Sequence, residues 1–195
     1  MDFGGVDQVV ELGPYLIRRA TSADAYPYAQ ADAEMVAETY RYTMPSAFAE
    51  ARLAEVPEAA ARLERELDAA LEAERRGEEP ARRSWLALAG DRVVGITVST
   101  AFEQFWEPTI GAVRPVGITW QLNHLYVRPE AHGSGLGQTL LDLALPGRRA
   151  AYLWLVGGND RARRFYERNG FSDEGTEYSC GPVWFDRPLF RLVRR

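Results

Sequence analysis

The feature that most constrains this chain is a β-like run that passes into a glycine-rich turn and then into a helical segment. The run ends at Val127, and alternating glycines follow at Gly133, Gly135 and Gly137. Glycine lets the backbone adopt positive φ angles and approach a ligand closely. The first turn of a helix leaves N–H groups without partners and carries the positive end of the helix dipole. The arrangement therefore predicts a cradle for a pyrophosphate group.

Two familiar phosphate cradles do not fit this spacing. The dinucleotide fingerprint requires G-x-G-x-x-G and an acidic residue ~20 positions later. Here the third glycine falls one position early, and the later region holds Gly158 and Asn159. A P-loop requires Gly-Lys-Ser/Thr, and this chain has no lysine there. Neither of these two cradles accounts for the pattern.

Strand-like and helix-like segments surround this turn. We expect strands over 15–19, 84–89, 92–100, 116–127, 150–156, 171–178 and 183–193. We expect helices over 23–42, 57–76, 135–144 and 160–169. This order is typical of a mixed α/β domain. Residues 1–14 are expected to form a loose lead-in and residues 15–195 a single domain.

Composition excludes several other functions. The net charge of −5 and the pI near 5.2 argue against nucleic-acid binding, which needs a basic face. We expect no membrane span, since no apolar stretch approaches ~20 residues, and no signal peptide. The one cysteine, Cys180, excludes an intrachain disulfide and Cys-ligated zinc, and we expect no metal. A cytoplasmic setting is the simplest expectation.

Two blocks resemble one enzyme family. The run Leu125-Tyr126-Val127-Arg128-Pro129 followed by His132-Gly133-Ser134-Gly135-Leu136-Gly137 resembles motif A of the GNAT superfamily of acyl-CoA N-acyltransferases, with His132 in place of the usual Arg or Gln. The run from Asn159 to Phe171 resembles motif B, Asn-x-x-Ala-x-x-Phe-Tyr-x-x-x-Gly-Phe. The resemblance spans about residues 15–193. The segment Glu38-Thr39-Tyr40-Arg41-Tyr42-Thr43-Met44-Pro45 further resembles bacterial polyamine-type members.

The resemblance implies a fold and a binding site for acetyl-CoA. The fold is a twisted mixed sheet of about seven strands flanked by helices. Acyl-CoA lies where the parallel strands at 116–127 and 150–156 splay apart. The implied cofactor-binding residues are Leu125, Tyr126 and Val127 at the pantetheine arm, His132, Gly133, Ser134, Gly135, Leu136, Gly137 and Gln138 at the pyrophosphate, Asn159 at the pantetheine or phosphate, and Phe165 at the thiol.

The implied reaction is direct transfer to an amine in a ternary complex. Tyr166 stands at the family position of the general acid that reprotonates the departing thiolate. Many members carry a glutamate as general base where this chain has Gln121, and an amide cannot take a proton. Two proton acceptors remain open: His124 acting directly, or a water chain anchored by Gln121, Asn123 and Glu103.

We therefore expect an acetyl-CoA-dependent N-acetyltransferase acting on a primary amine of a small molecule or peptide. Family members are often dimers, so the resemblance also implies a homodimer. Two rival functions stay open. One is a non-catalytic acyl-CoA-binding or sensor domain, because position 121 lacks a carboxylate. The other is a nucleotide-binding protein of another fold.

Overall fold

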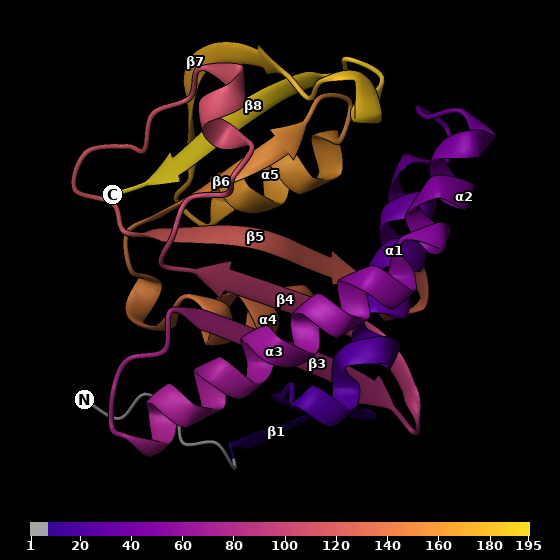
Figure 1. Ribbon diagram of the computed structural model, residues 1–195, viewed down its shortest axis with the longest axis vertical. Coiled ribbons are helices and arrows are strands. Elements are labelled where there is room, and N and C mark those ends of the chain that lie inside the picture. Colours follow the sequence, from indigo (N-terminus) through magenta and orange to yellow (C-terminus); the bar gives the residue numbers. More distant parts are fainter. Residues whose placement is uncertain (1–7) are drawn as a thin grey trace. The chain divides into compact units, whose positions relative to one another are not determined.

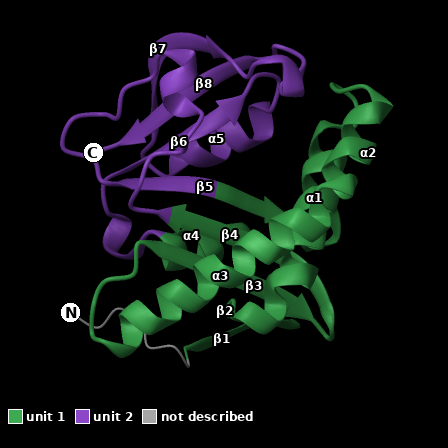
Figure 2. Ribbon diagram, viewed as in Figure 1, with its two compact units in different colours: residues 1–99, 124–144 green, residues 100–123, 145–195 purple. Residues whose placement is uncertain are grey.

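The computed structural model describes residues 8–195 and divides into two compact units (Figure 2). The first unit comprises the chain up to Ser99 together with residues 124–144. The second comprises residues 100–123 and 145–195. Eight strands follow one another in the hydrogen-bonding order β1-β2-β3-β4-β5-β6-β8-β7, and β5 contributes residues to both units.

The first unit holds an antiparallel start to the sheet and most of the helices (Figure 1). β1 pairs antiparallel with β2, and β2 pairs antiparallel with β3. In chain order the elements are β1 (Val9–Leu12), β2 (Tyr15–Arg19), the 3-10 helix η1 (Ser22–Asp24), α1 (Ala25–Tyr40), α2 (Ser46–Ala54), α3 (Val56–Arg75), β3 (Arg82–Ala89), β4 (Arg92–Thr100), the second half of β5 (Trp120–Val127), the 3-10 helix η3 (Pro129–Ala131) and α4 (Leu136–Ala144).

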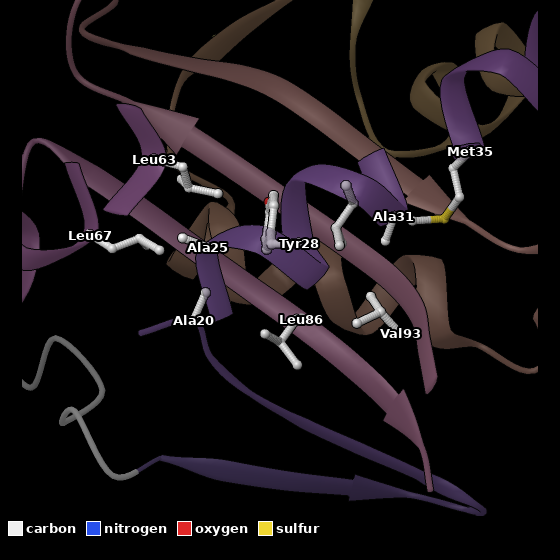
Figure 3. Close-up of a cluster of buried hydrophobic side chains, with 10 residues drawn as sticks. Ala20, Ala25, Tyr28, Ala31, Met35, Leu63, Leu67, Leu86 and Val93 are labelled. Atoms are coloured by element: carbon white, nitrogen blue, oxygen red, sulfur yellow. The ribbon is translucent and has the colours of Figure 1, made fainter. Parts of the chain in front are cut away.

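Helices cover both faces of the strands in this unit. On one face, α1 and α3 pack over β3 and β4 around Tyr28, Met35 and Leu63, as Figure 3 shows. On the other face, α4 packs through Leu136 and Leu140. Burial of such apolar side chains stabilises the folded state by about 25 cal/mol per Å² of apolar surface removed from water. The two layers hold β4 and the end of β5 between them.

In the second unit, the first half of β5 pairs with β6. Trp120 to Leu122 pair in parallel with Ala151 to Leu153, as expected for this pair of strands. β6 then pairs antiparallel with β8, and β8 with β7. Besides the first half of β5, the elements of this unit are the 3-10 helix η2 (Glu107–Ile110), the 3-10 helix η4 (Pro146–Arg148), β6 (Ala151–Val156), α5 (Asp160–Arg168), β7 (Ser172–Ser179), the 3-10 helix η5 (Pro182–Trp184) and β8 (Pro188–Arg194).

The mixed α/β fold class is confirmed, with eight strands rather than about seven. The additional strand is β1, which lies in the segment expected to be a loose lead-in. Gly13, at φ +57°, reverses the chain so that Val9 to Leu12 pair with β2. Residues 1–7 of that lead-in lie outside the described residues.

Three further boundaries differ from the sequence-based expectation. A helix that the sequence did not predict, α2, follows Pro45, and the ring of its Phe48 packs edge-on against that of Tyr40 at 6.5 Å. β5 begins at Trp120, because Gly117 adopts φ +76° in a turn where a strand was expected from residue 116. β8 begins at Pro188, because η5 occupies the start of the expected strand. In the part of the chain described, no helix is both long and apolar enough to span a membrane.

Candidate active site

The end of β5 presents its side chains alternately to the two helical layers. Leu125 and Val127 pack against the cluster that contains α4, whereas Tyr126 packs against the cluster that contains α1. His124 shares the face of Tyr126, and the centres of the two rings lie 5.8 Å apart. Successive strand residues point to opposite faces, so the main chain at 124–127 separates an apolar face from one that carries a titratable ring.

The turn after β5 is closed by short local hydrogen bonds. The Ser134 hydroxyl donates to the carbonyl of Ala131 at 2.7 Å and accepts from the N–H of Leu136 at 3.3 Å. The His132 N–H donates to the carbonyl of Pro129 at 3.1 Å. Gly133 and Gly135 adopt φ +80° and +87°, a region that L-residues rarely occupy. Glycine is therefore required for this turn.

Four N–H groups remain unused where α4 begins. Within residues 8–195, the main-chain N–H groups of Gly133, Gly135, Gly137 and Gln138 find no hydrogen-bond acceptor. The turn from His132 to Gly135 is exposed. These donors and the positive end of the α4 dipole together fit a phosphate oxygen. The predicted cradle therefore contains two kinds of N–H group. Four are available to a ligand, and the other three, those of His132, Ser134 and Leu136, are hydrogen-bonded within the turn.

His132 is engaged with the strand that precedes it. Its Nε2 atom lies 2.8 Å from the carbonyl oxygen of Val127, which fits an Nε2–H donor. The carbonyl of Val127 is accordingly used within the protein. This contact links the turn to the end of β5. The sequence did not predict this structural role for His132.

His124 forms the most informative side-chain pair on the α1 face. Its Nδ1 atom lies 2.9 Å from Oδ1 of Asp32 on α1. The exposed fractions of the two side chains are 42% and 25%. Sequence reasoning missed Asp32. The sequence pattern could have indicated it, because Asp32 is a charged residue within an otherwise apolar helical stripe. It lies four residues after Tyr28 and three before Met35.

Gln121, the other predicted proton acceptor, lies in a different setting. It is 2% exposed, and its Oε1 has no hydrogen-bond donor among the described residues. Asn123 accepts a hydrogen bond from the Thr100 hydroxyl at 3.0 Å, and Glu103 lies 3.6 Å from Arg114. These contacts do not decide between His124 and the water chain, so both proton acceptors stay predictions.

The motif B residues are placed by α5 in the second unit. The Asn159 Oδ1 accepts from the N–H of Ala162 at 3.1 Å and so caps the helix. Tyr166 is 8% exposed, and its ring lies edge-on to Phe165 at 5.3 Å and to Phe171 at 5.8 Å. Phe165 is half-buried. The roles predicted for these three residues stay predictions.

Cys180 has the properties of an unreactive thiol. Burial raises its pKa to about 11, although Arg187 acts in the opposite direction. The thiolate is the nucleophilic form of cysteine, so this side chain does not suit nucleophilic catalysis. In the chain from residue 8 onward, no group of three or more His, Cys, Asp or Glu side chains is arranged to hold a metal ion.

Comparison with known proteins supports the family resemblance of the two motif blocks. Residues 80–173 match the family model described as "Acetyltransferase (GNAT) domain". A protein of Mycobacterium tuberculosis named as a probable N-acetyltransferase is 31% identical over 101 residues, which is 51% of this chain and 52% of that protein. The match thus spans about half the length of this curated relative.

Solved structures extend the likeness along the chain. The structure of PaiA N-acetyltransferase from Thermoplasma acidophilum in complex with coenzyme A has a TM-score of 0.62 and 17% identity, covering 91% of this chain and 97% of that one. A GNAT acetyltransferase from Streptococcus pneumoniae has a TM-score of 0.59 and 19% identity, covering 92% and 98%. At these identities the likeness concerns the fold. The family match over residues 80–173, together with the likeness in fold, confirms the resemblance of the two motif blocks to the GNAT superfamily of acyltransferases.

Proposed function

We propose that this protein is an acetyl-CoA-dependent N-acetyltransferase whose acceptor is a primary amine of a small molecule or peptide. The observation that carries the proposal is the set of four unused N–H groups at Gly133, Gly135, Gly137 and Gln138. Unbonded N–H groups at the start of a helix suit the diphosphate of coenzyme A. The matched acetyltransferase domain and the coenzyme A complex of the PaiA relative support the same ligand.

The residues around the turn divide the work of binding. We assign the diphosphate to the four N–H groups and the pantetheine arm to the main chain of Leu125 and Tyr126. The Val127 carbonyl is already paired with His132, so it contributes less than the family pattern implies. The predicted contacts of Asn159 and Phe165 with the coenzyme belong to this proposal too.

Acetyl-CoA supplies an activated thioester carbonyl, and the protein supplies proton transfer. A lysine-like ammonium has a pKa of ~10.4 and must lose a proton before it attacks. The departing thiol has a pKa of ~8.5 and a tyrosine ~10, so a positioned phenol can return a proton to the thiolate. We assign that proton to Tyr166, and the N–H of Leu125 is our candidate donor to the oxyanion.

Release of free thiol tests the function. Purified protein would be mixed with acetyl-CoA and a panel of polyamines, amino acids, aminoglycosides and peptides with free amines. We expect thiol release that depends on at least one amine and yields an acetylated product by mass spectrometry. Tight coenzyme A binding without release for any amine would contradict the enzyme.

That contrary outcome would favour a non-catalytic acyl-CoA sensor. Two observations keep this second candidate: Gln121 stands where a carboxylate is usual, and Tyr166 is buried between Phe165 and Phe171. A sensor needs the cradle but not the phenol. Substitution of Tyr166 by phenylalanine therefore separates the two functions, because only the enzyme would lose turnover.

A cytoplasmic location and a homodimer complete the proposal. The single cysteine suits a reducing compartment, and dimers are frequent in this superfamily. Fractionation of cells and light scattering of the purified protein test these two points separately from activity.

A further inference from the structure

The main-chain carbonyl of His124 is held by a side chain of the neighbouring strand β4. The Thr97 hydroxyl donates a hydrogen bond to it at 3.0 Å. Thr97 is fully buried, and its own carbonyl accepts a hydrogen bond from the buried Tyr28 hydroxyl of α1, also at 3.0 Å. These three residues all belong to the first unit. Two successive hydrogen bonds therefore connect α1 through β4 to the peptide between His124 and Leu125.

The direction of this carbonyl fixes the direction of the N–H group that follows it. The peptide between His124 and Leu125 is trans, as are the others from residue 8 onward. In a planar trans peptide the C=O and N–H bonds point in opposite directions. Because the His124 carbonyl faces Thr97 on β4, the N–H of Leu125 faces away from β4.

Two other main-chain contacts show the same alternation along β5. The N–H of Arg128 donates to the carbonyl of Val94 on β4 at 2.9 Å, so position 128 faces β4 as position 124 does. The carbonyl of Val127, two positions after Leu125, lies instead 2.8 Å from the ring of His132. The main chain at 125 and 127 therefore faces the other edge of β5.

On that other edge, Leu125 lies beyond the ladder that pairs β5 with its second neighbour. This neighbour is β6, and the two strands pair from Trp120 to Leu122. Leu125 follows the last pair by three residues, so its N–H has no partner in this ladder of the described chain. An N–H group without a ladder partner is what the proposed contact with the thioester oxygen requires.

We infer that Thr97 is a positioning residue for the oxyanion donor, because its hydroxyl orients the peptide that carries the N–H of Leu125; this inference rests on the proposed acetyltransferase function. As the amine nitrogen bonds to the acetyl carbon, negative charge develops on the carbonyl oxygen, and the N–H of Leu125 stabilises it without losing its proton. The amine proton passes to one of the two predicted acceptors. The carbonyl re-forms as the carbon–sulfur bond breaks, and Tyr166 gives a proton to the thiolate. A donor that is oriented beforehand needs no reorganisation during the reaction.

β4 offers a matched control two residues further along. Ser99 is fully buried like Thr97, and its hydroxyl also donates to a main-chain carbonyl, that of Ala144 at the end of α4, at 2.7 Å. Thr97→Val and Ser99→Ala each remove one buried hydrogen bond from a carbonyl, so we expect similar losses of stability. Only the first of these carbonyls belongs to the peptide that carries the proposed donor.

The sequence allows this single peptide to be observed by nuclear magnetic resonance. The chain has two histidines, and only His124 is followed by leucine. Full-length protein labelled with carbonyl carbon-13 histidine and nitrogen-15 leucine therefore gives one carbon–nitrogen correlation, that of the His124–Leu125 peptide. Spectra would be recorded with coenzyme A and with acetyl-CoA, because these ligands differ by the acetyl group alone.

We expect acetyl-CoA to shift the amide proton of Leu125 further than coenzyme A does, in the wild type and in Ser99→Ala. Thr97→Val should move the carbonyl resonance of His124 and reduce the difference between the two ligands at Leu125. Loss of an oxyanion donor costs about 10²–10³-fold in kcat. A misdirected donor should therefore lower kcat at least about tenfold in Thr97→Val, with KM for acetyl-CoA close to the wild-type value.

Two further variants complete the set. Thr97→Ser keeps the hydroxyl and should retain kcat, which a general loss of packing at this position would not predict. Tyr28→Phe removes the hydrogen bond that holds Thr97 from α1. It should lower kcat in the same direction, and it replaces Thr97→Val if that variant does not fold.

The outcomes separate this inference from the proposed function. Wild-type transfer with equal kcat in Thr97→Val and Ser99→Ala would overturn the inference and leave the acetyltransferase intact. Identical shifts of the Leu125 amide with the two ligands, or a fall in kcat without a change at the His124 carbonyl, would also overturn it. Absence of transfer by the wild type itself would defeat the proposed function, and the inference with it.

Discussion

Gly95 of β4 and Leu140 of α4 approach so closely that a Cβ atom on Gly95 would lie 2.9 Å from Cδ1 of Leu140. The same atom would lie 3.2 Å from Cδ2 of Leu136, the first residue of α4. Both leucines are fully buried. A glycine in the strand therefore allows the helix that carries the proposed cradle to pack directly on the sheet.

Substitution of Gly95 by valine is expected to displace the start of α4. Overpacking of a filled core costs about 1–3 kcal/mol, and the shift should also weaken coenzyme A binding. Chemical denaturation and calorimetric titration measure the two effects. The double variant Gly95→Val/Leu140→Ala restores much of the volume, so its loss of stability should be smaller than the sum of the single losses. Strict additivity would contradict this contact.

Substitution of Gly135 by alanine should weaken coenzyme A binding more than tenfold. Gly135 adopts φ +87°, and a Cβ atom there meets nothing within 4 Å, so the cost is backbone strain. Left-handed backbone costs an L-residue about 1–2 kcal/mol. Gly77 is the matched control, because it adopts φ +74°, is equally open and follows α3, away from the cradle. Gly77→Ala should lose similar stability and keep full affinity; equal affinities in the two variants would argue against the cradle.

Replacement of Tyr166 by phenylalanine should lower turnover by about 10²-fold, the usual range for general acid catalysis. The ring packing against Phe165 and Phe171 survives this change, so thermal stability should alter little. Steady-state rates and melting curves measure the two effects. Turnover equal to that of the wild type would remove Tyr166 from the mechanism and, with weak activity throughout, favour the sensor.

Tyr152→Phe offers the contrasting control in the same unit. The Tyr152 hydroxyl donates to both carboxylate oxygens of the buried Glu107, at 3.2 and 3.1 Å. Its loss should cost about 1–3 kcal/mol of stability, as for a buried group left with fewer hydrogen bonds. We expect turnover to stay close to the wild-type value.

Asp24 should make the fold less stable in acid. Burial disfavours the charged carboxylate, but two hydrogen bonds from Arg18, both at 2.7 Å, and those from Thr21 outweigh it and lower the pKa of Asp24 below 3.8. The stabilisation is therefore present above the unfolded-state pKa of ~3.9 and is lost as the pH falls through the lower folded-state value. Asp24→Asn should reduce stability at pH 7 and flatten its decline between about pH 5 and 2. Denaturation at several pH values measures this; an unchanged pH profile would contradict it.

Local patterns in the sequence were sufficient for much of the fold. Thr21 and Asp24 form the capping box that their spacing predicts. The apolar residues that recur at three- and four-residue steps along α3 are buried, including Leu63 and Leu67. The turn with Gly135 precedes α4 as expected. Capping, helical periodicity and turn chemistry each depend on residues a few positions apart, so they can be read without the rest of the chain.

Other elements depended on partners that no local pattern identifies. β1 forms a strand because its backbone pairs with that of β2. α2 is stabilised by the contact between the rings of Phe48 and Tyr40. The motif predicts that His132 donates a hydrogen bond to a phosphate, whereas its ring contacts the carbonyl of Val127. In each case a segment could form several different contacts, and the tertiary structure selects one of them.

The sequence by itself determined the resemblance to the GNAT superfamily, the order of most helices and strands, and the position of the glycine turn, because those features are encoded over short windows. Only the tertiary structure decided which N–H groups of the turn stay open and that Asp32 faces His124. The physical reason is that the direction of a hydrogen bond and the approach of α1 to β5 depend on how the layers pack, and packing sums weak contacts over residues far apart in the chain.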